Sequence, residues 1–227
     1  MRRPTLDTGA QGQQTLSRQP VEVPPGRWCE GTAGPGGELW FVIAGAGRLE
    51  SPAIDDTPIR RDTGLWLPPG VDYRIHSGGP DALRLDRVTL PAGVIGQAGT
   101  GGPVPRVSEL SECAMEVTGN RRFRVLFGPG NGCEAATQFV GEIPPGRAPD
   151  HTHTYDELVL VLEGEGIAHT GEGDHPLAPG ATLHLRPGQV HCLENTGQAT
   201  LRVLGVFHPG GSPAAKKERP GRGQRSA

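Results

Sequence analysis

The sequence contains an internal repeat, and this repeat constrains the fold more than any other feature. The run PPGR occurs at residues 24–27 and again at residues 144–147, an offset of 120 residues. Three further pairs follow in the same order at offsets of 119, 118 and 118: ELWFVIAGAG (38–47) with ELVLVLEGEG (157–166), LPPG (67–70) with LRPG (185–188), and ALRLDRVTLP (82–91) with TLRVLGVFHP (200–209). Four ordered matches with nearly constant offsets indicate a tandem duplication.

Both copies consist of short β-rich runs that end in turn residues. The 36 glycines and 23 prolines fall mainly between short apolar runs, and long stretches with helical spacing are hard to find. The run ELVLVLEG is apolar on both faces, so we expect a strand that is buried on both sides, as in a sandwich or a closed barrel. The sequence therefore predicts an all-β protein.

Composition and charge exclude some classes of protein. The formal net charge of −3 gives no reason to expect nucleic-acid binding. The basic run KKERPGRGQR at 216–225 is interpreted as a solvated, disordered end. No apolar run approaches membrane-spanning length, and the first residues contain no apolar segment of a secretory signal. We therefore expect a cytoplasmic protein in which all four cysteines are free thiols.

The run HTHTYDE at 151–157 places three candidate metal ligands within seven residues. On a strand His151 and His153 would point the same way, whereas on a helix they would lie about 200° apart. Glu157 begins an apolar run, and His191 follows a Pro-Gly turn that can bring it opposite the first three. Three imidazoles and one carboxylate suit a first-row divalent metal. Two solvated histidines in a turn are the alternative interpretation, which does not account for the other two ligands.

The spacing around these ligands resembles the two motifs of the cupin family. The first motif is matched by Gly146-x4-His151-x-His153-x3-Glu157-x6-Gly164, and the second by Gly180-x7-Gly188-x2-His191-x3-Asn195. The resemblance covers residues 21–91 and 133–209, so the chain resembles a bicupin. It implies an all-β fold with two tandem cupin barrels of the double-stranded β-helix or jelly-roll type. It also implies that the metal ligands are His151, His153, Glu157 and His191.

The chain departs from the family pattern in two places, neither of which is a ligand. The first spacer is one residue shorter than usual, and Arg186 replaces the usual proline before Pro187. Arg186 would lie near the mouth of the barrel, where a guanidinium can meet an anionic substrate.

The first half of the chain lacks the imidazoles of the second. The position that matches His191 is Tyr73, and the stretch EGTAGPGG at 30–37 contains no histidine. This half cannot hold the same metal. We expect a flexible arm at 1–18, a degenerate barrel without metal ligands at 19–92, a linker at 93–112, a metal-binding barrel at 113–210 and a basic disordered tail at 211–227.

The resemblance implies several functions that the residues alone do not separate. We expect a metal-dependent oxygenase or dioxygenase that acts on a small oxygen-rich organic molecule, with one divalent ion per chain (Fe, Mn, Ni, Cu or Zn). One alternative is a redox-neutral isomerase or lyase that uses the metal as a Lewis acid. Another is a non-catalytic binding or sensor protein. Glu157 is the candidate catalytic residue, because a carboxylate can serve as a general base. A small-molecule substrate is the expected partner, and a homodimer is compatible with this architecture.

Overall fold

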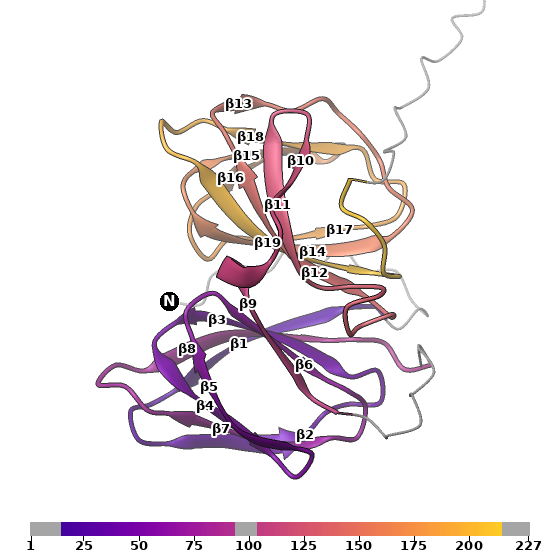
Figure 1. Cartoon of the computed structure of the whole chain (residues 1–227). Coiled ribbons are helices and arrows are strands. Elements are labelled where there is room, and N and C mark those ends of the chain that lie inside the picture. Colours follow the sequence, from indigo (N-terminus) through magenta and orange to yellow (C-terminus); the bar gives the residue numbers. More distant parts are fainter. Residues whose placement is uncertain (1–14, 94–103, 215–227) are drawn as a thin grey trace, which may run out of the picture.

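Each half of the chain folds into two antiparallel sheets that face each other. The computed structural model describes residues 15–93 and 104–214 and shows two such barrels, one above the other (Figure 1). The one helical element of the described residues is a 3-10 turn, η1 (Leu110–Glu112). The predicted all-β fold with two tandem barrels is confirmed. The described part of the chain has no helix that is long and apolar enough to cross a membrane.

The N-terminal barrel consists of a five-stranded and a four-stranded sheet. The larger sheet contains, in spatial order, β1 (Ser17–Val23), β8 (Leu83–Thr89), β3 (Glu38–Ala44), β6 (Thr63–Leu67) and β9 (Arg106–Glu109). The smaller sheet contains β2 (Trp28–Thr32), β7 (Asp72–Ser77), β4 (Ala46–Ser51) and β5 (Ile54–Arg60).

The C-terminal barrel consists of a six-stranded and a four-stranded sheet. The larger sheet contains β10 (Glu116–Thr118), β11 (Arg121–Phe127), β12 (Thr137–Ile143), β19 (Leu201–His208), β14 (Asp156–Glu163) and β17 (Thr182–Leu185). The smaller sheet contains β13 (Gly146–Arg147), β18 (His191–Asn195), β15 (Gly166–Thr170) and β16 (Gly173–Leu177).

The strand order repeats between the two halves as the sequence repeat does. The order β1-β8-β3-β6 corresponds to β12-β19-β14-β17, and β2-β7-β4-β5 corresponds to β13-β18-β15-β16. Two additions lie outside the repeat. Strand β9 extends the larger sheet of the first barrel at β6, and the hairpin β10–β11 extends that of the second at β12. Both additions come from the stretch between the repeats, so this segment supplies strands to both barrels.

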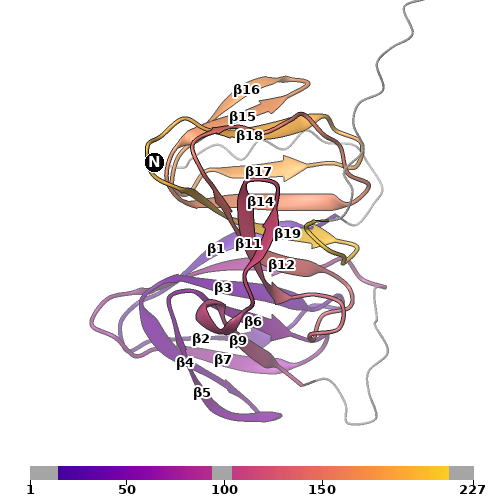
Figure 2. The same ribbon diagram turned by 45° about the horizontal axis from the view of Figure 1, so that its top comes forward.

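The two larger sheets pack back to back, so the molecule has four layers of sheet (Figure 2). Side chains alternate along β14: Val159 and Val161 face the interior of the second barrel, while Leu158 and Leu160 join the apolar layer between the barrels. Strand β3 repeats this arrangement in the first barrel. The prediction that ELVLVLEG is buried on both faces is therefore confirmed. The first barrel covers the outer face of this strand.

Polar contacts join the barrels at the edges of this apolar layer. Arg202 of the second barrel forms an ion pair with Asp62 of the first at 2.8 Å, and Arg61 forms one with Glu163. The amide of Gln138 donates a hydrogen bond to the main-chain carbonyl of Trp40 at 3.3 Å. The pair of Arg61 with Glu163 is exposed and contributes little free energy. The apolar layer carries most of the contact between the barrels.

The structure describes only part of the expected arm, linker and tail. Residues 1–14 of the expected arm and the basic run 216–225 lie outside them. Strand β1 begins at Ser17, and the segment 104–112 of the expected linker contains β9 and η1.

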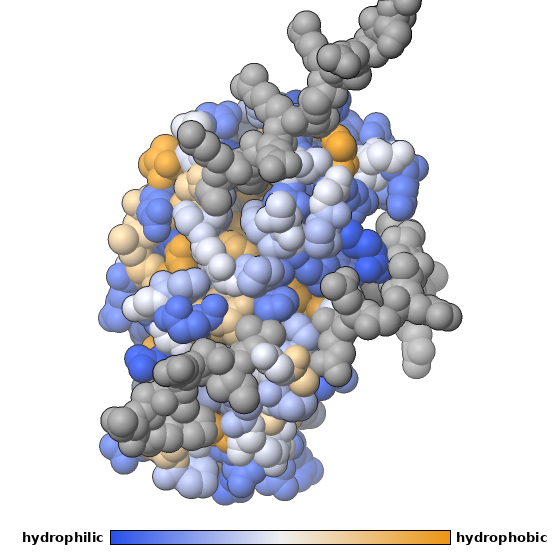
Figure 3. Space-filling model, turned by 90° about the vertical axis from the view of Figure 1, so that its right-hand side faces the viewer, coloured by the Kyte–Doolittle hydropathy of each residue, from blue (hydrophilic) through white to orange (hydrophobic). Residues whose placement is uncertain are grey.

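Large exposed hydrophobic side chains are few on the described surface. They are Val104, Met115, Val117 and Val190. On the face seen in Figure 3, hydrophobic residues appear as small patches between hydrophilic ones. The main apolar faces of the two halves thus cover each other within one chain, and the homodimer stays a prediction.

We predict that Leu204→Ala lowers the free energy of unfolding by about 2–5 kcal/mol, since it opens a cavity in the layer between the barrels. All three tryptophans belong to the first barrel, whereas Leu204 belongs to the second. The urea midpoint of the tryptophan fluorescence transition should therefore fall in Leu204→Ala. It should stay unchanged in Val117→Ala, which alters an exposed side chain. An unchanged tryptophan transition in Leu204→Ala would mean that the barrels unfold independently.

Candidate metal centre

The two histidines of the HxH pair lie in the connection between β13 and β14. His151 forms an isolated bridge with His191, in which each main-chain N–H donates to the other residue's carbonyl at 3.0 Å. His153 lies outside any strand, so the expected regular strand through both histidines is not formed. Both rings nevertheless reach His191, with ring centroids 4.4 Å (His151) and 4.9 Å (His153) from it.

A tight turn places His191 at the start of β18. The main-chain N–H of Gln189 donates to the carbonyl of Arg186 at 3.1 Å, which closes the turn. Gly188 has a φ of +77°, a conformation that glycine adopts without the strain that a Cβ would add. The N–H of Gly188 also donates to the carbonyl of His153 at 2.8 Å, so this turn fixes both histidine-bearing segments.

Three of the four predicted ligands meet in one cluster. One ligand atom each from His153, Glu157 and His191 lies within 4.8 Å of the others, and all three residues are at most 8% exposed. Among residues 15–93 and 104–214 this is the one such group of three. His151 is also buried, but it contributes no atom to the close group.

The hydrogen bonds of the cluster fit a metal ion. The Nδ1 atoms of His151 and His191 lie 3.1 and 2.9 Å from the carbonyls of Pro149 and Gln189. A carbonyl only accepts, so each Nδ1 donates, and in the neutral ring Nε2 is then the atom that can bind a metal. Both ring nitrogens of His153 are buried, and neither has a hydrogen-bond partner in the described part of the chain. Its Nε2 lies 3.1 Å from Glu157 Oε2, without the alignment of a hydrogen bond. Buried polar atoms rarely go unpaired, and a cation between His153 Nε2 and the Glu157 carboxylate would pair these two groups.

Tyr155 holds the ring of His153 in place. The two rings stack with centroids 4.0 Å apart and an interplanar angle of 7°. The other contact of Tyr155 is with Phe207 of β19, with ring centroids 4.2 Å apart. Burial raises the pKa of the Tyr155 phenol, so the ring stays neutral at physiological pH.

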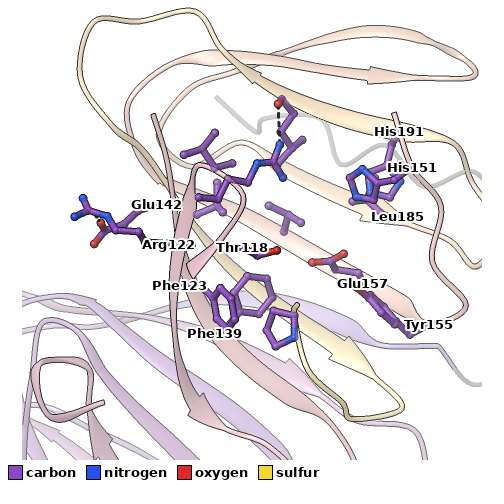
Figure 4. Close-up of a pocket in the computed structure, with 17 residues that line it drawn as sticks. Thr118, Arg122, Phe123, Phe139, Glu142, His151, Tyr155, Glu157, Leu185 and His191 are labelled. Carbon is purple, nitrogen blue, oxygen red and sulfur yellow. Dashed lines mark hydrogen bonds and ion pairs between the residues drawn. The ribbon is translucent and has the colours of Figure 1, made fainter. Parts of the chain in front are cut away.

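A cavity with about 660 Å³ of empty space, part of it open to solvent, extends from this cluster into the second barrel. Figure 4 shows His151 and His191 on one side, Phe123 and Phe139 on the other, and the carboxylate of Glu157 between them. The predicted ligands His151, Glu157 and His191 line the cavity together with Tyr155. The arrangement can hold a cation at one end of a largely apolar chamber.

Three charged residues that line the cavity, Arg121, Arg122 and Glu142, were not identified by the sequence motifs. Arg121 lines the cavity, whereas Arg186, which the motif comparison placed near the barrel mouth, does not. The signal available in the sequence was alternation along RRFRVLF, in which Arg121 shares a face with Phe123. Alternation predicts that Arg121 and Phe123 share one face of the strand. It does not predict into which barrel that face points, because the strand lies outside the repeat.

The first barrel has bulky side chains where the second has its cavity. Trp40 stands at the position that matches Val159, and Tyr73 at the position that matches His191. The two rings pack edge to face with centroids 5.5 Å apart inside the first barrel. Glu38, which matches Glu157, accepts a hydrogen bond from Trp40 Nε1 at 2.9 Å. The retained carboxylate is thus bound by an indole N–H in place of a cation.

We predict that the double variant His151→Ala/His191→Ala retains no stoichiometric divalent metal, because two of the four donors are removed. Metal content per chain after dialysis, determined by plasma mass spectrometry, checks this. Tyr73→Phe is the matched control, since it alters the corresponding position of the first barrel and should leave the metal content unchanged. One metal per chain in the double variant would contradict the assignment.

We also predict that Tyr155→Ala weakens metal binding about 10-fold or more, since the ring that orients His153 is lost. Tyr155→Phe keeps the stacking surface and should bind metal as tightly as the original protein. Competition with a coloured chelator gives both affinities. Equal affinities of Tyr155→Ala and Tyr155→Phe would show that the stacking does not support the ligand.

Comparison with known proteins agrees with the repeat and the fold. Residues 139–207 match the cupin domain family. The oxalate-binding protein of Thermotoga maritima is 34% identical over 68 residues, which are 29% of this chain and 56% of that protein. Auxin-binding protein T85 of Nicotiana tabacum is 33% identical over 75 residues, 28% of this chain and 40% of that protein. The chain thus spans about half the length of these relatives.

A solved structure extends the likeness to both barrels. A mutant of oxalate decarboxylase from Bacillus subtilis superposes with a TM-score of 0.71, covering 87% of this chain and 70% of that one at 13% identity. At this identity the likeness concerns the fold alone. The match at 139–207 shows a cupin domain in the second barrel, and the repeated strand order gives the chain the two-barrel fold of the oxalate decarboxylase structure.

Proposed function

We propose that the protein is a metal-dependent enzyme that acts on a small oxygen-rich organic molecule and uses dioxygen as the oxidant. His151, His153, Glu157 and His191 would hold one divalent ion. The observation that carries this proposal is the buried cluster itself: two imidazoles and a carboxylate meet at a cavity, and the nitrogens of His153 have no hydrogen-bond partner among the described residues.

The donor set indicates which ions suit the site. Neutral imidazole nitrogens and one carboxylate oxygen favour Fe, Mn, Ni, Cu or Zn over the hard cations Mg and Ca. A bound ion of this group supplies Lewis acidity and, where it is redox-active, an electron-transfer centre beside the substrate.

Glu157 is the group that this chain offers for proton transfer. Its carboxylate lies in the cavity between the histidines and the two phenylalanines (Figure 4). A carboxylate at this place can accept a proton from a substrate hydroxyl or from a carbon next to a carbonyl. The apolar walls around it keep water away from the reacting atoms and strengthen its electrostatic interactions.

The named relatives favour a second candidate, a binding protein without turnover. Two proteins that match this chain at 33–34% identity are named for binding, one of oxalate and the other of auxin. Each match covers less than a third of this chain. A cytoplasmic location and a homodimer are expected under either candidate.

We predict about one equivalent of Fe, Mn, Ni or Cu per chain in protein purified without added metal or a histidine tag. With a panel of small hydroxy acids, keto acids and diketones, an oxygen electrode should then record uptake that Glu157→Gln lowers at least 100-fold. Substrate turnover under nitrogen would favour an isomerase or lyase in place of an oxygenase. Thermal stabilisation by a ligand without any turnover would favour the binding protein.

A further inference from the structure

The cavity of the second barrel contains a cation that no acidic side chain neutralises. Arg122, its neighbour in β11, forms an ion pair with Glu142 at 2.9 Å. Arg121 instead donates from Nη2 to the main-chain carbonyl of Leu193 at 3.3 Å. Within residues 15–93 and 104–214, Arg121 has no carboxylate at ion-pair distance. Its remaining N–H groups are therefore available to an anion.

The position of Arg121 fixes where such an anion would lie. Arg121 and Phe123 share the inner face of β11, in the larger sheet, whereas Leu193 belongs to β18 in the smaller sheet. The side chain therefore crosses the cavity from one sheet to the other. Burial lowers the pKa of this guanidinium, and the nearby charge of Glu157 partly offsets the shift. An arginine nevertheless stays protonated in proteins.

With a divalent ion bound, the charges in the cavity would favour an anionic ligand. The pair formed by Arg122 and Glu142 is neutral, which leaves Arg121 and Glu157 as opposite single charges. A divalent ion at the histidine cluster would make the chamber net positive. A ligand that carries one or two negative charges would balance it.

The walls of the cavity indicate the rest of the ligand. They are mainly apolar and include Phe123, Phe139, Ile143, Val159, Leu193 and Val203. A ligand that is polar throughout, such as a two-carbon diacid, would leave these walls in contact with water. An aliphatic or aromatic body would cover them and gain from burial.

We propose that Arg121 binds the carboxylate of a monocarboxylic acid whose apolar body lies against Phe123 and Phe139. The other end of this acid then faces the histidine cluster, a placement that rests on the proposed function. Arg121 is thus the residue that selects an acid over the corresponding neutral compound.

The test measures binding by titration calorimetry with acetate, butyrate, hexanoate, phenylacetate and the neutral phenylacetamide. The full chain is used, metal-loaded and metal-free. Affinity should rise about 3- to 4-fold per added CH₂ from acetate to hexanoate. Phenylacetamide should bind at least 10-fold more weakly than phenylacetate, because the charge-assisted contact is absent.

Variants assign the effect to Arg121. Arg121→Gln should lose at least 10-fold in affinity for hexanoate, and Arg121→Lys should recover part of this loss. Arg74→Gln is the matched control, with the same change in charge on an exposed arginine of the first barrel, and should stay within 2-fold. Metal content should be unchanged in all three. If Arg121→Gln does not fold, the comparison of phenylacetate with phenylacetamide in the original protein decides.

The outcomes separate this inference from the proposed function. Carboxylate binding within 2-fold of normal in Arg121→Gln, or no gain from acetate to hexanoate, overturns the role of Arg121 even if metal binds. Equal binding of phenylacetate and phenylacetamide overturns it as well. If the chain takes up no metal at all, binding of hexanoate that depends on Arg121 still supports this inference, whereas the metal-dependent function is contradicted.

Discussion

The apolar layer between the two larger sheets is the contact on which the rest of the structure depends. It covers the outer faces of β3 and β14, which would otherwise expose a continuous row of leucines and a phenylalanine. Strand β14 begins with the segment that carries Glu157, and its inner face contributes Val159 to the cavity. Packing that immobilises this strand from behind also immobilises the carboxylate in front. The first barrel therefore contributes to the site of the second without supplying a ligand.

The two barrels have the same strand order, but their interiors differ. Where the second barrel has Val159 and His191, the first has Trp40 and Tyr73, whose packed rings fill its interior. Glu38 remains there because the indole N–H of Trp40 satisfies it. A buried carboxylate without that donor or a cation would be costly. The tryptophan and tyrosine of the first barrel thus occupy the space that the cavity and His191 occupy in the second.

Much of this architecture could be predicted from the sequence because the internal repeat indicates two folding units with the same order of strands. The run ELVLVLEG predicted a strand buried on both faces, and the ligand spacing predicted that distant histidines meet. The strands β9 to β11 could not be predicted in the same way, since they lie outside the repeat and have no matching partner. The direction of Arg121 depends on a contact between distant strands, which local patterns do not encode. The stacking of Tyr155 on His153 occurs in a connection without regular structure, for which strand alternation makes no prediction.

The position of the hairpin β10–β11 has a consequence for the passage of ligands. Strand β14 is pressed against the first barrel, so the wall that carries Glu157 cannot swing outward without exposing the leucines behind it. The opposite edge of the same sheet is formed by β10, which is three residues long, pairs only with β11 within the described chain and bears the exposed Val117. An edge with so few contacts opens at a small cost in free energy. Molecules would thus enter and leave beside this hairpin, past Thr118 and Arg121, and the pace of that exchange would be set by the hairpin and not by the metal ligands.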